Sequence, residues 1–580
     1  MRTGLLLPAL VLVYRGMATL ADAVEATDSS ACQSQIYCEG PILHAVQMAD
    51  IFNDSKVFVD LPLKFPPDIV LSNFAALNWN SSTSPRTDLL QFVTGNFGPI
   101  GSDLLRWTPP DWEETPSFLK RLSRNDKYFS FAKSVHQLWL SLGREAVPMV
   151  KATPERYSLL YTPHPMIVPG GRFRESYYWD TFWIVKGLLV SDMVTTAQHL
   201  VDNLLHLCSV YGFVPNGNRI YYTTRSQPPL LSDMVHAVYN ALRRQNGPGA
   251  RAFLESALPV LEKEYLFWST NRASTKFAPL CIYNAETTLP RPESYREDVA
   301  LASELTSPTA KETLFTNIAA AAESGWDFSS RWLRDGKRLQ TIDTTAIVPV
   351  DLNVYMLRFE CNMARFYNAT GNPSKAAEFI ANAVARHDHM EKLLWNDQSK
   401  QWNDYFIVEG KLSGRVAASN FVPFWGFSDP LLATHTTVVS KQRLREAFEA
   451  FQLSGLVGVA GIRATMATET GQQWDSPNGW ACIQHILVES FLENYPPGSL
   501  QFSVGRRIGR DWLETNMVAF QKHPYMYEKY DVDVMGMGGG GGEYIPQTGF
   551  GWTNGVALVF LNDPRILPDP EPESIESENY

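Results

Sequence analysis

The chain has 580 residues, of which 45% are hydrophobic and 19% charged, so we expect a folded protein with a sizeable core. Its formal net charge of −11 argues against a nucleic-acid partner, because phosphate backbones are bound by basic surfaces. Aromatic residues reach 12%, including 16 tryptophans. Flat rings suit the faces of sugars, although large cores also use tryptophan.

The first residues have the pattern of an export signal. Arg2 precedes an apolar run, Gly4–Tyr14, and the small residues of Ala21-Asp22-Ala23 fit a cleavage site, so we predict a signal peptide over residues 1–23. This run is too short to span a membrane, and no later apolar run is long enough. The acidic, proline-rich residues 564–580 predict a flexible tail without a hydrophobic anchor. We therefore expect a soluble, secreted, extracellular protein.

Residues 24–129 are predicted to form an irregular arm that packs on the main domain. Cys32 and Cys38 are close in sequence, so a short-loop disulfide between them is plausible in a secreted protein, while the state of the other four cysteines stays open. Three Asn-X-Ser/Thr sequons, at Asn53, Asn80 and Asn368, are predicted glycosylation sites if they are exposed during secretion.

Residues 130–563 are predicted to form one all-α domain. Ser307 can cap a helix that begins at Pro308, and Gly325 supplies a left-handed residue after its end. No alternation of short strands with helices suggests a parallel sheet. Comparable patterns predict helices over residues 131–145, 182–209, 231–244, 252–270, 352–367, 374–394, 441–453, 480–493, 499–520 and 552–561.

Four loops between these helices combine arginine, carboxylate, amide and aromatic side chains. The first, PGGRFRESYYWD (Pro169–Asp180), opens with a Pro-Gly-Gly turn that lets the backbone bend sharply. The others are NGNRIYYTTRSQ (Asn216–Gln227), RPESY (Arg291–Tyr295) and QQWDSPNGW (Gln472–Trp480). A single loop of this kind is more often a surface turn with salt bridges. Four of them indicate a deep site for a sugar, since the polar groups bind hydroxyls and the rings cover sugar faces.

Hydrolysis of a glycosidic bond needs one protonated and one ionised carboxyl group. Asp327 is the better candidate acid, because Trp326 and Phe328 flank it and an apolar setting raises the pKa of a carboxyl group. Glu528, in YMYEKYDV, lies among tyrosines that can orient it and a water molecule. By local sequence alone, Asp327 could equally be a surface aspartate at a helix end, and Glu528 a helix-surface partner of Lys529.

The run GMGGGGGEY (Gly536–Tyr544) contains the pattern GxGxxG, but five consecutive glycines satisfy almost any glycine pattern. No strand–turn–helix context supports a dinucleotide site. We predict instead a mobile loop that closes over the site with Glu543 at its end, a plain flexible linker being the alternative. The motifs HExxH, CxxC and GxSxG are absent, and we expect no metal and no cofactor.

Together these segments resemble the trehalases, inverting glycoside hydrolases that split α,α-trehalose into two glucose molecules. PGGRFRESYYWD and QQWDSPNGWA are similar to the two signature segments of that family. NDSKVFVDLPLK, RPESY, ESGWDFSSRW, EKYDV and GGGGGEYIPQTGFGWTNGV resemble further family segments, so the resemblance spans nearly the whole mature chain. It implies an (α/α)6 toroid with long active-site loops, which acts on trehalose and has no nucleic-acid partner and no membrane anchor.

The resemblance also implies roles for individual residues. Asp327 corresponds to the general acid and Glu528 to the general base, and the two carboxyl groups of an inverting enzyme are expected roughly 6.5–9.5 Å apart. Substrate contacts are implied for Arg172, Trp179, Asp180, Asn216, Arg225, Gln227, Arg291, Glu293, Gly325 and Glu543. Further candidates for the pocket lining are Phe173, Gln473, Trp474 and Asp475.

One residue departs from the family pattern. Cys482 stands where the second signature has a proline after Trp-Ala. Because proline makes the start of a helix rigid, its loss is expected to loosen Trp474 without abolishing activity. Two alternatives to a trehalase remain open: a helical-toroid glucosidase for another glucoside, and a catalytically inactive sugar-binding protein.

Overall fold

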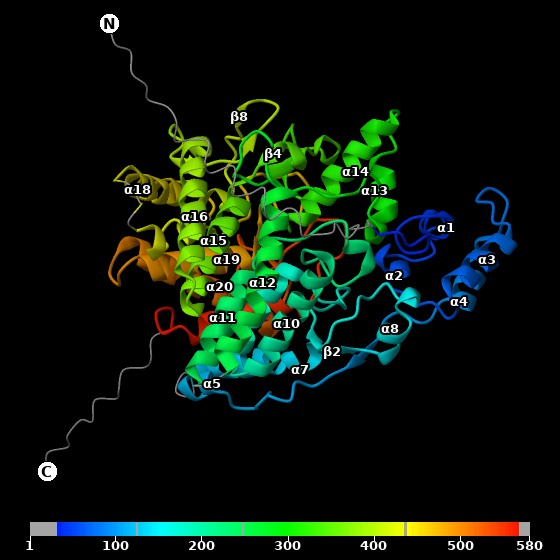
Figure 1. Ribbon diagram of the computed structural model, residues 1–580, viewed down its shortest axis with the longest axis horizontal. Helices are drawn as coiled ribbons and strands as arrows, with labels where there is room; N and C mark the ends of the chain where they lie inside the picture. The colour runs from blue at the N-terminus through cyan, green and yellow to red at the C-terminus, as the bar shows by residue number, and fades with distance from the viewer. Residues whose placement is uncertain (1–31, 123–125, 246–248, 434, 436–437, 568–580) are drawn as a thin grey trace, which may run out of the picture.

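The computed structural model describes residues 32–122, 126–245, 249–433, 435 and 438–567. The predicted signal peptide lies outside the described residues, as does most of the predicted tail. Helices dominate the described chain, and its strands are short (Figure 1). The expected all-α class is therefore confirmed.

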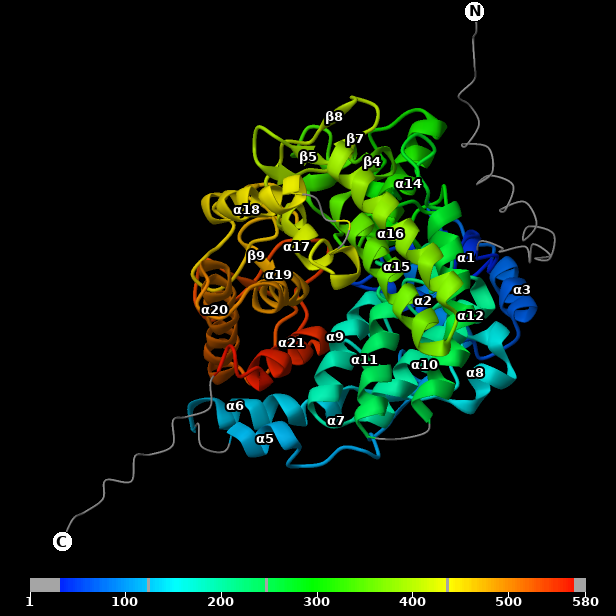
Figure 2. The same ribbon diagram turned by 60° about the vertical axis from the view of Figure 1, so that its left-hand side comes forward.

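Six helices form an inner ring, in which each helix contacts the next and the last contacts the first (Figure 2). They are α9 (Tyr178–Val190), α11 (Leu231–Arg244), α15 (Val350–Thr370), α17 (Pro423–Gly426), α19 (Ala481–Asn494) and α21 (Gly551–Asn562). Most are apolar on every side and buried along nearly their whole length, as a helix covered on all faces must be. The ring closes where α21 meets α9: a Cβ on Gly187 would lie 2.5 Å from the Cα of Gly555, so the two backbones touch.

A second set of helices lies outside this ring (Figure 2). It contains α6 (Asp126–Gln137), α10 (Val194–Tyr211), α12 (Gly249–Thr270), α16 (Pro373–Leu393), α18 (Val438–Leu453) and α20 (Leu500–Lys522). α10 packs on α9 and α11, α12 on α11 and α15, α16 on α15, and α20 on α19 and α21, while α6 covers α21. This double ring of alternating inner and outer helices is the (α/α)6 toroid that the sequence led us to expect.

The predicted helices are found within a few residues of their expected bounds, with two exceptions. The predicted helix 182–209 is two helices, α9 and α10, because the chain turns at Asp192, which has φ 60°. The predicted helix 131–145 ends early, since α6 is followed by α7 (Trp139–Leu142) and then by the strand β2 (Gly143–Ala146). In contrast, α14 (Pro308–Glu323) begins as predicted, with the Ser307 hydroxyl accepting the N–H of Ala310.

The arm differs from the irregular segment that we expected, because it contains short helices. These are α1 (Pro41–Met48), α2 (Lys56–Val59), α3 (Pro67–Leu77), α4 (Arg86–Asn96) and α5 (Ser117–Leu122). An apolar cluster that includes Phe58 and Phe97 packs the arm against Tyr177, Tyr221 and Tyr222 of the main body. The helices α1–α4 project from one side of the toroid (Figure 1), and Cys32 and Cys38 form the expected disulfide.

The strands form four small sheets, three of which connect segments that are distant in sequence. One consists of β1 (Leu104–Arg106), β2 and β3 (Met166–Ile167); another of β4 (Ile347–Val348), β7 (Tyr405–Phe406) and β8 (Lys411–Leu412); a third of β5 (Trp395–Asn396) and β6 (Gln401–Trp402). The fourth is antiparallel, with β10 (Lys529–Asp531) between β9 (Asn478–Trp480) and β11 (Met537–Gly538). This last sheet joins the second signature segment, the EKYDV segment and the glycine-rich run, so it positions the site.

Two further short helices, α8 (Pro148–Ala152) and α13 (Tyr295–Leu301), and the longer α14 lie in the connections. Among the described residues, none of the helices combines the length and the apolar character that crossing a membrane requires.

Candidate active site

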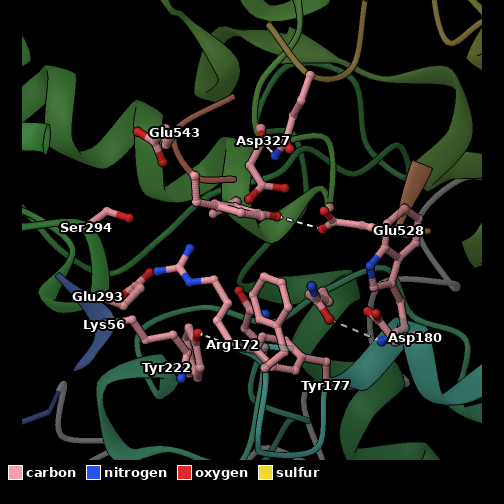
Figure 3. A pocket seen from close by; sticks show the side chains of 18 of the residues that line it. Lys56, Arg172, Tyr177, Asp180, Tyr222, Glu293, Ser294, Asp327, Glu528 and Glu543 are labelled. Carbon is pink, nitrogen blue, oxygen red and sulfur yellow. Dashed lines mark hydrogen bonds between the residues drawn. The ribbon is translucent and has the colours of Figure 1, made fainter. Parts of the chain in front are cut away.

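A cavity lies at the end of the toroid where the inner helices α9, α19 and α21 begin. Figure 3 shows its lining from close by. Every predicted site residue except Asp475 lines it. The lining comprises Lys56, Arg172, Phe173, Tyr177, Trp179, Asp180, Asn216, Tyr222, Arg225, Gln227, Arg291, Glu293, Ser294, Ala322, Gly325, Asp327, Gln473, Trp474, Trp480, Glu528, Glu543, Tyr544, Phe550 and Trp552. The four loops that we singled out in the sequence thus meet at one place.

Asp327 and Glu528, the predicted acid and base, both point into this cavity (Figure 3). They come from separate parts of the chain: Asp327 follows helix α14, and Glu528 precedes strand β10. Burial raises the pKa of Asp327 to about 7, although the nearby positive charge of Arg291 acts in the opposite direction. At neutral pH a large fraction of Asp327 is therefore protonated, as a general acid requires.

The backbone before Asp327 is fixed by close packing. Gly325 has φ 74°, and a Cβ at this position would lie 2.4 Å from the ring of Trp179. The next residue, Trp326, stacks on Trp474 with 4.9 Å between ring centroids, and Trp474 stacks in turn on Trp480 at 4.0 Å. Only glycine fits beneath the indole of Trp179, so the approach of this loop to the cavity depends on Gly325.

Asp475 does not line the cavity, so its predicted place in the pocket is wrong. Its carboxylate is 1% exposed and accepts hydrogen bonds from the hydroxyls of Thr465 and Thr470 and from both the hydroxyl and the N–H of Ser330. A further bond comes from Ser329. These donors occupy both oxygens and hold the loop that follows the acid. Asp475 therefore supports the position of the catalytic loop.

Glu528 is 2% exposed and is held by donors on both carboxylate oxygens. The Tyr544 hydroxyl donates to Oε1 at 2.8 Å, and the backbone N–H of Gln547 donates to Oε2 at 3.2 Å. Its backbone is also bonded, since the Trp552 indole N–H donates to its carbonyl. These hydrogen bonds fix the position of the carboxyl group, so that it can orient an attacking water molecule.

Lys529, next to the base, connects the base to the acid. Its Nζ donates to Oε1 of Gln473 at 2.6 Å, and the Gln473 amide nitrogen donates to the backbone carbonyl of Asp327. Lys529 Nζ also reaches the carbonyl of Gly541 in the glycine-rich loop at 3.3 Å. Its side chain is fully buried, and burial lowers its pKa. One ammonium group thus joins the base strand, the acid loop and the glycine-rich loop.

Asp180 provides a third carboxyl group in the cavity. It lies in the first turn of α9 and is 6% exposed. Burial raises its pKa well above the ordinary value, and the negative charges of Glu528 and Asp327 add to this shift. A neutral Asp180 can donate as well as accept a hydrogen bond, which suits contact with a sugar hydroxyl.

On the opposite wall, amides and ion pairs position two arginines. Arg225 donates to Glu293 at 2.6 Å and to the Asn216 side-chain oxygen at 2.8 Å. The two arginines Arg225 and Arg291 lower the pKa of Glu293 despite its burial. Gln227 accepts the N–H of Trp179 at 3.2 Å, which fixes the loop before α11 against the start of α9.

The glycine-rich loop is closed over the cavity. Its Glu543 pairs with Arg291 at 3.0 Å, while Arg291 is anchored from behind by Asp298 at 2.6 Å. The N–H of Gly542 donates to the carbonyl of Gly471 at 3.1 Å. The loop therefore has the position of a lid, with its carboxylate in the cavity lining.

Arg172 connects this lid to the arm. Its guanidinium pairs with Asp54 at 2.7 Å and lies 4.5 Å from the ring centroid of Tyr544. The backbone N–H of Arg172 donates to the side-chain oxygen of Gln547 at 2.7 Å. The neighbouring Phe173 packs edge-on against Tyr544.

Several lining residues were not predicted from the sequence. Lys56, in the first turn of α2, is fully buried and pairs with Asp60 and Glu175 at 2.6 Å each. The arm therefore contributes to the cavity, which only a three-dimensional contact can reveal. Lys56 occurs in a segment that we quoted only for its family resemblance. The remaining unpredicted residues are Tyr177, Tyr222, Ser294, Ala322, Trp480, Tyr544, Phe550 and Trp552, and most of them occur within the quoted loops.

Cys482 is buried in the first turn of α19, beside a small apolar cavity. We expected the missing proline to loosen Trp474. The indole of Trp474 is nevertheless 1% exposed and sandwiched between Trp326 and Trp480. Stacking on both faces holds this residue without help from a proline.

A helical toroid with two carboxyl groups in one polar, ring-lined cavity defines a glycoside hydrolase. Comparison with known proteins agrees with this class. The Trehalase family model matches residues 50–564. The chain is 40% identical to trehalase of Oryctolagus cuniculus over 542 residues, which cover 92% of this chain and 90% of that protein. It is 41% identical to trehalase of Homo sapiens, with 92% and 89% covered.

A solved structure is also similar. Neutral trehalase Nth1 of Saccharomyces cerevisiae matches with a TM-score of 0.56 at 25% identity, over 68% of this chain and 73% of that one. The chain belongs to the trehalase family.

Proposed function

We propose that this protein hydrolyses α,α-trehalose to two glucose molecules with inversion at one anomeric carbon. Family membership supports the substrate. The observation that carries the chemistry is that Asp327 and Glu528 line one cavity, because burial raises the pKa of Asp327 to about 7 and hydrogen bonds from Tyr544 and Gln547 hold both oxygens of Glu528.

In the proposed mechanism, Asp327 donates its proton to the oxygen that links the two glucose units. Glu528 accepts a proton from a water molecule that attacks the anomeric carbon from the opposite face. The reaction yields one α- and one β-glucose. Because the pKa of Asp327 is about 7, turnover is expected to fall as the pH rises above 7 and the acid loses its proton.

The proposed substrate contacts follow from the cavity lining. Arg225 and Arg291 present guanidinium donors that suit adjacent hydroxyls, and the aromatic residues of the lining suit the apolar parts of glucose. Glu543, on the lid, can contact substrate only while the lid is closed, so lid opening must accompany substrate binding and product release.

The test is to incubate the purified protein with trehalose and to follow the anomers by NMR. We expect equal initial amounts of α- and β-glucose; a product that is initially all α would exclude the inverting mechanism. Maltose is the control substrate: preferential hydrolysis of maltose would favour the alternative glucosidase, and no glucose from either sugar would favour the inactive sugar-binding protein.

We also propose that the protein is secreted and glycosylated. The signal-peptide pattern over residues 1–23 supports export, and Asn53, Asn80 and Asn368 are all exposed and thus accessible to glycosylation. Expression in secretory cells followed by treatment with a glycosidase that removes N-glycans tests both points. An unglycosylated protein confined to the cell interior would contradict them.

A further inference from the structure

A second cleft lies outside the catalytic cavity, where β1 and β2 meet the Pro-Gly-Gly turn and the segment before α21. Three arginines line it, and the rest of its wall consists of glycines, Ser141, Thr548 and apolar residues. We call it the arginine cleft; it is lined by Gly101, Leu104, Arg106, Ser141, Leu142, Arg144, Val168, Gly170, Gly171, Phe173, Arg174, Thr548 and Gly549.

The three positive charges of this cleft face one another. Arg106 and Arg144 are directly opposite in the antiparallel β1–β2 pair, so their side chains lie on the same face of the sheet. Arg174 approaches from the first signature loop. Burial is the main cause that lowers the pKa of Arg144, and the positive charges of Arg106 and Arg174 lower it further. Like charges directly opposite in a sheet are destabilising, so the arrangement carries a cost in the empty protein.

No acidic side chain of the described chain neutralises this cluster by an ion pair with any of the three arginines. Glu145 is the nearest acid in sequence, but it is the next residue along β2, and successive residues of a strand point to opposite faces. Arg144 is held in place by its own backbone contacts, since its Nη1 donates to the carbonyls of Ser141 and Gly143 at 2.9 and 2.8 Å. These contacts fix the guanidinium and leave its remaining donors available.

We propose that the arginine cleft binds a small oxyanion of the phosphate or sulfate class, either free or as the charged group of a phosphorylated sugar. Guanidinium groups present forked donors that match the oxygens of such anions. The chain has a net charge of −11, so a general excess of basic residues does not explain why three arginines lie together without acidic partners among the described residues. A bound anion would offset their repulsion.

The arginine cleft adjoins the base of the lid. In the Pro-Gly-Gly turn, the Pro169 carbonyl accepts the N–H of Gly551 at 2.7 Å. Thr548 and Gly549 form one wall of the cleft. The turn continues into Arg172, which lines the catalytic cavity. The anion would therefore contact the same turn that anchors the lid.

The test is to measure thermal unfolding of the full chain during titration with inorganic phosphate, sulfate or glucose 6-phosphate, with sodium chloride keeping the ionic strength constant. We expect a saturable rise of roughly 2–3 °C at one hundred times the dissociation constant. A response to glucose 6-phosphate indicates a site open to phosphorylated sugars, and a response to the inorganic anions alone indicates a closed one; both outcomes support the proposal.

The double variant Arg144→Gln/Arg174→Gln should lose the saturable response, while the matched control Arg244→Gln, with an exposed arginine on α11, should keep it. In chloride alone the double variant should unfold at a slightly higher temperature than the wild type, because the repulsion is removed. A rise that is linear in phosphate and equal in both proteins is the general effect of excluded anions and would overturn the proposal. So would the absence of any response to all three anions.

Discussion

The loop that carries Asp327 and the segment that carries Glu528 show how a carboxyl group can serve as an acid in one place and as a base in another. Asp327 stands at the end of a tightly packed loop, and no described side chain donates a hydrogen bond to its carboxyl group; burial raises its pKa to about 7. Glu528 is 2% exposed, and both of its oxygens accept hydrogen bonds. The two carboxyl groups therefore differ in the donors that surround them, and this difference accompanies their different roles.

The largest expected effect separates the two roles directly. Asp327→Asn and Glu528→Gln should each reduce turnover of trehalose by about 10²- to 10⁴-fold. Fluoride leaves without a proton, so Asp327→Asn should hydrolyse α-glucosyl fluoride far better than trehalose, whereas Glu528→Gln should be impaired on both. Steady-state rates on the two substrates check this.

Equal impairment of the two variants on the fluoride would show that Asp327 has a role other than proton donation. The matched control is Asp335→Asn, because that exposed aspartate lies on the same connection and pairs only with its neighbours. It should retain activity on both substrates.

The second prediction removes one donor from the base. Tyr544→Phe should lower the turnover number about ten- to a hundredfold, the worth of a hydrogen bond to a charged group. The steady-state turnover of trehalose is the measurement. Tyr239→Phe, which does not line the cavity, is the control. Turnover equal to that of the wild type would mean that the Tyr544 hydroxyl does not assist Glu528.

A third prediction concerns the connection between the two regions. Lys529→Met should remove the hydrogen bond to Gln473, whose amide nitrogen donates to the backbone carbonyl of Asp327. We therefore expect the turnover number to fall about tenfold and the basic limb of the pH–rate profile to shift. The exposed Lys392→Met serves as control. If turnover falls while both limbs stay in place, Lys529 has a general role in stability only.

The smallest effect concerns stability. The folded protein binds the Asp327 proton more tightly than the unfolded chain does, so the stability that this group contributes is complete below about pH 4 and is lost as the pH rises through about 7. Asp327→Asn should therefore stabilise the protein at pH 8, by at most about 4 kcal/mol, and have little effect at pH 4. Denaturant unfolding at both values checks this; equal effects would contradict the assigned shift.

Much of the site could be predicted, because a sugar site needs particular residue types and these occur in four dense loops. The sequence could not distinguish a residue that faces the cavity from one that supports it. Asp475 and Gln473 are two residues apart in the same loop, but Asp475 accepts bonds from surrounding serines and threonines whereas Gln473 faces the cavity. That difference is set by tertiary contacts.

The fold was predictable where helix periodicity is strong and less so at turns and in the arm. Helix α11 has the predicted bounds, because its apolar stripe and polar face are well separated. The turn at Asp192 has a left-handed backbone without glycine, so the strongest signal for a helix end was missing, although aspartate tolerates this conformation better than most residues. Lys56 enters the cavity from an arm more than a hundred residues before the first signature, and no local pattern indicates such a contact.

The closure of the inner ring by α21 against α9 has a consequence for biosynthesis. Gly187 and Gly555 meet across this seam, so the ring stays open until α21 has been synthesised. A product truncated before Gly551 would leave one side of α9 without cover and would also lack Trp552. Nonsense mutations before Gly551 should therefore yield chaperone substrates with no residual activity, rather than weakened enzymes.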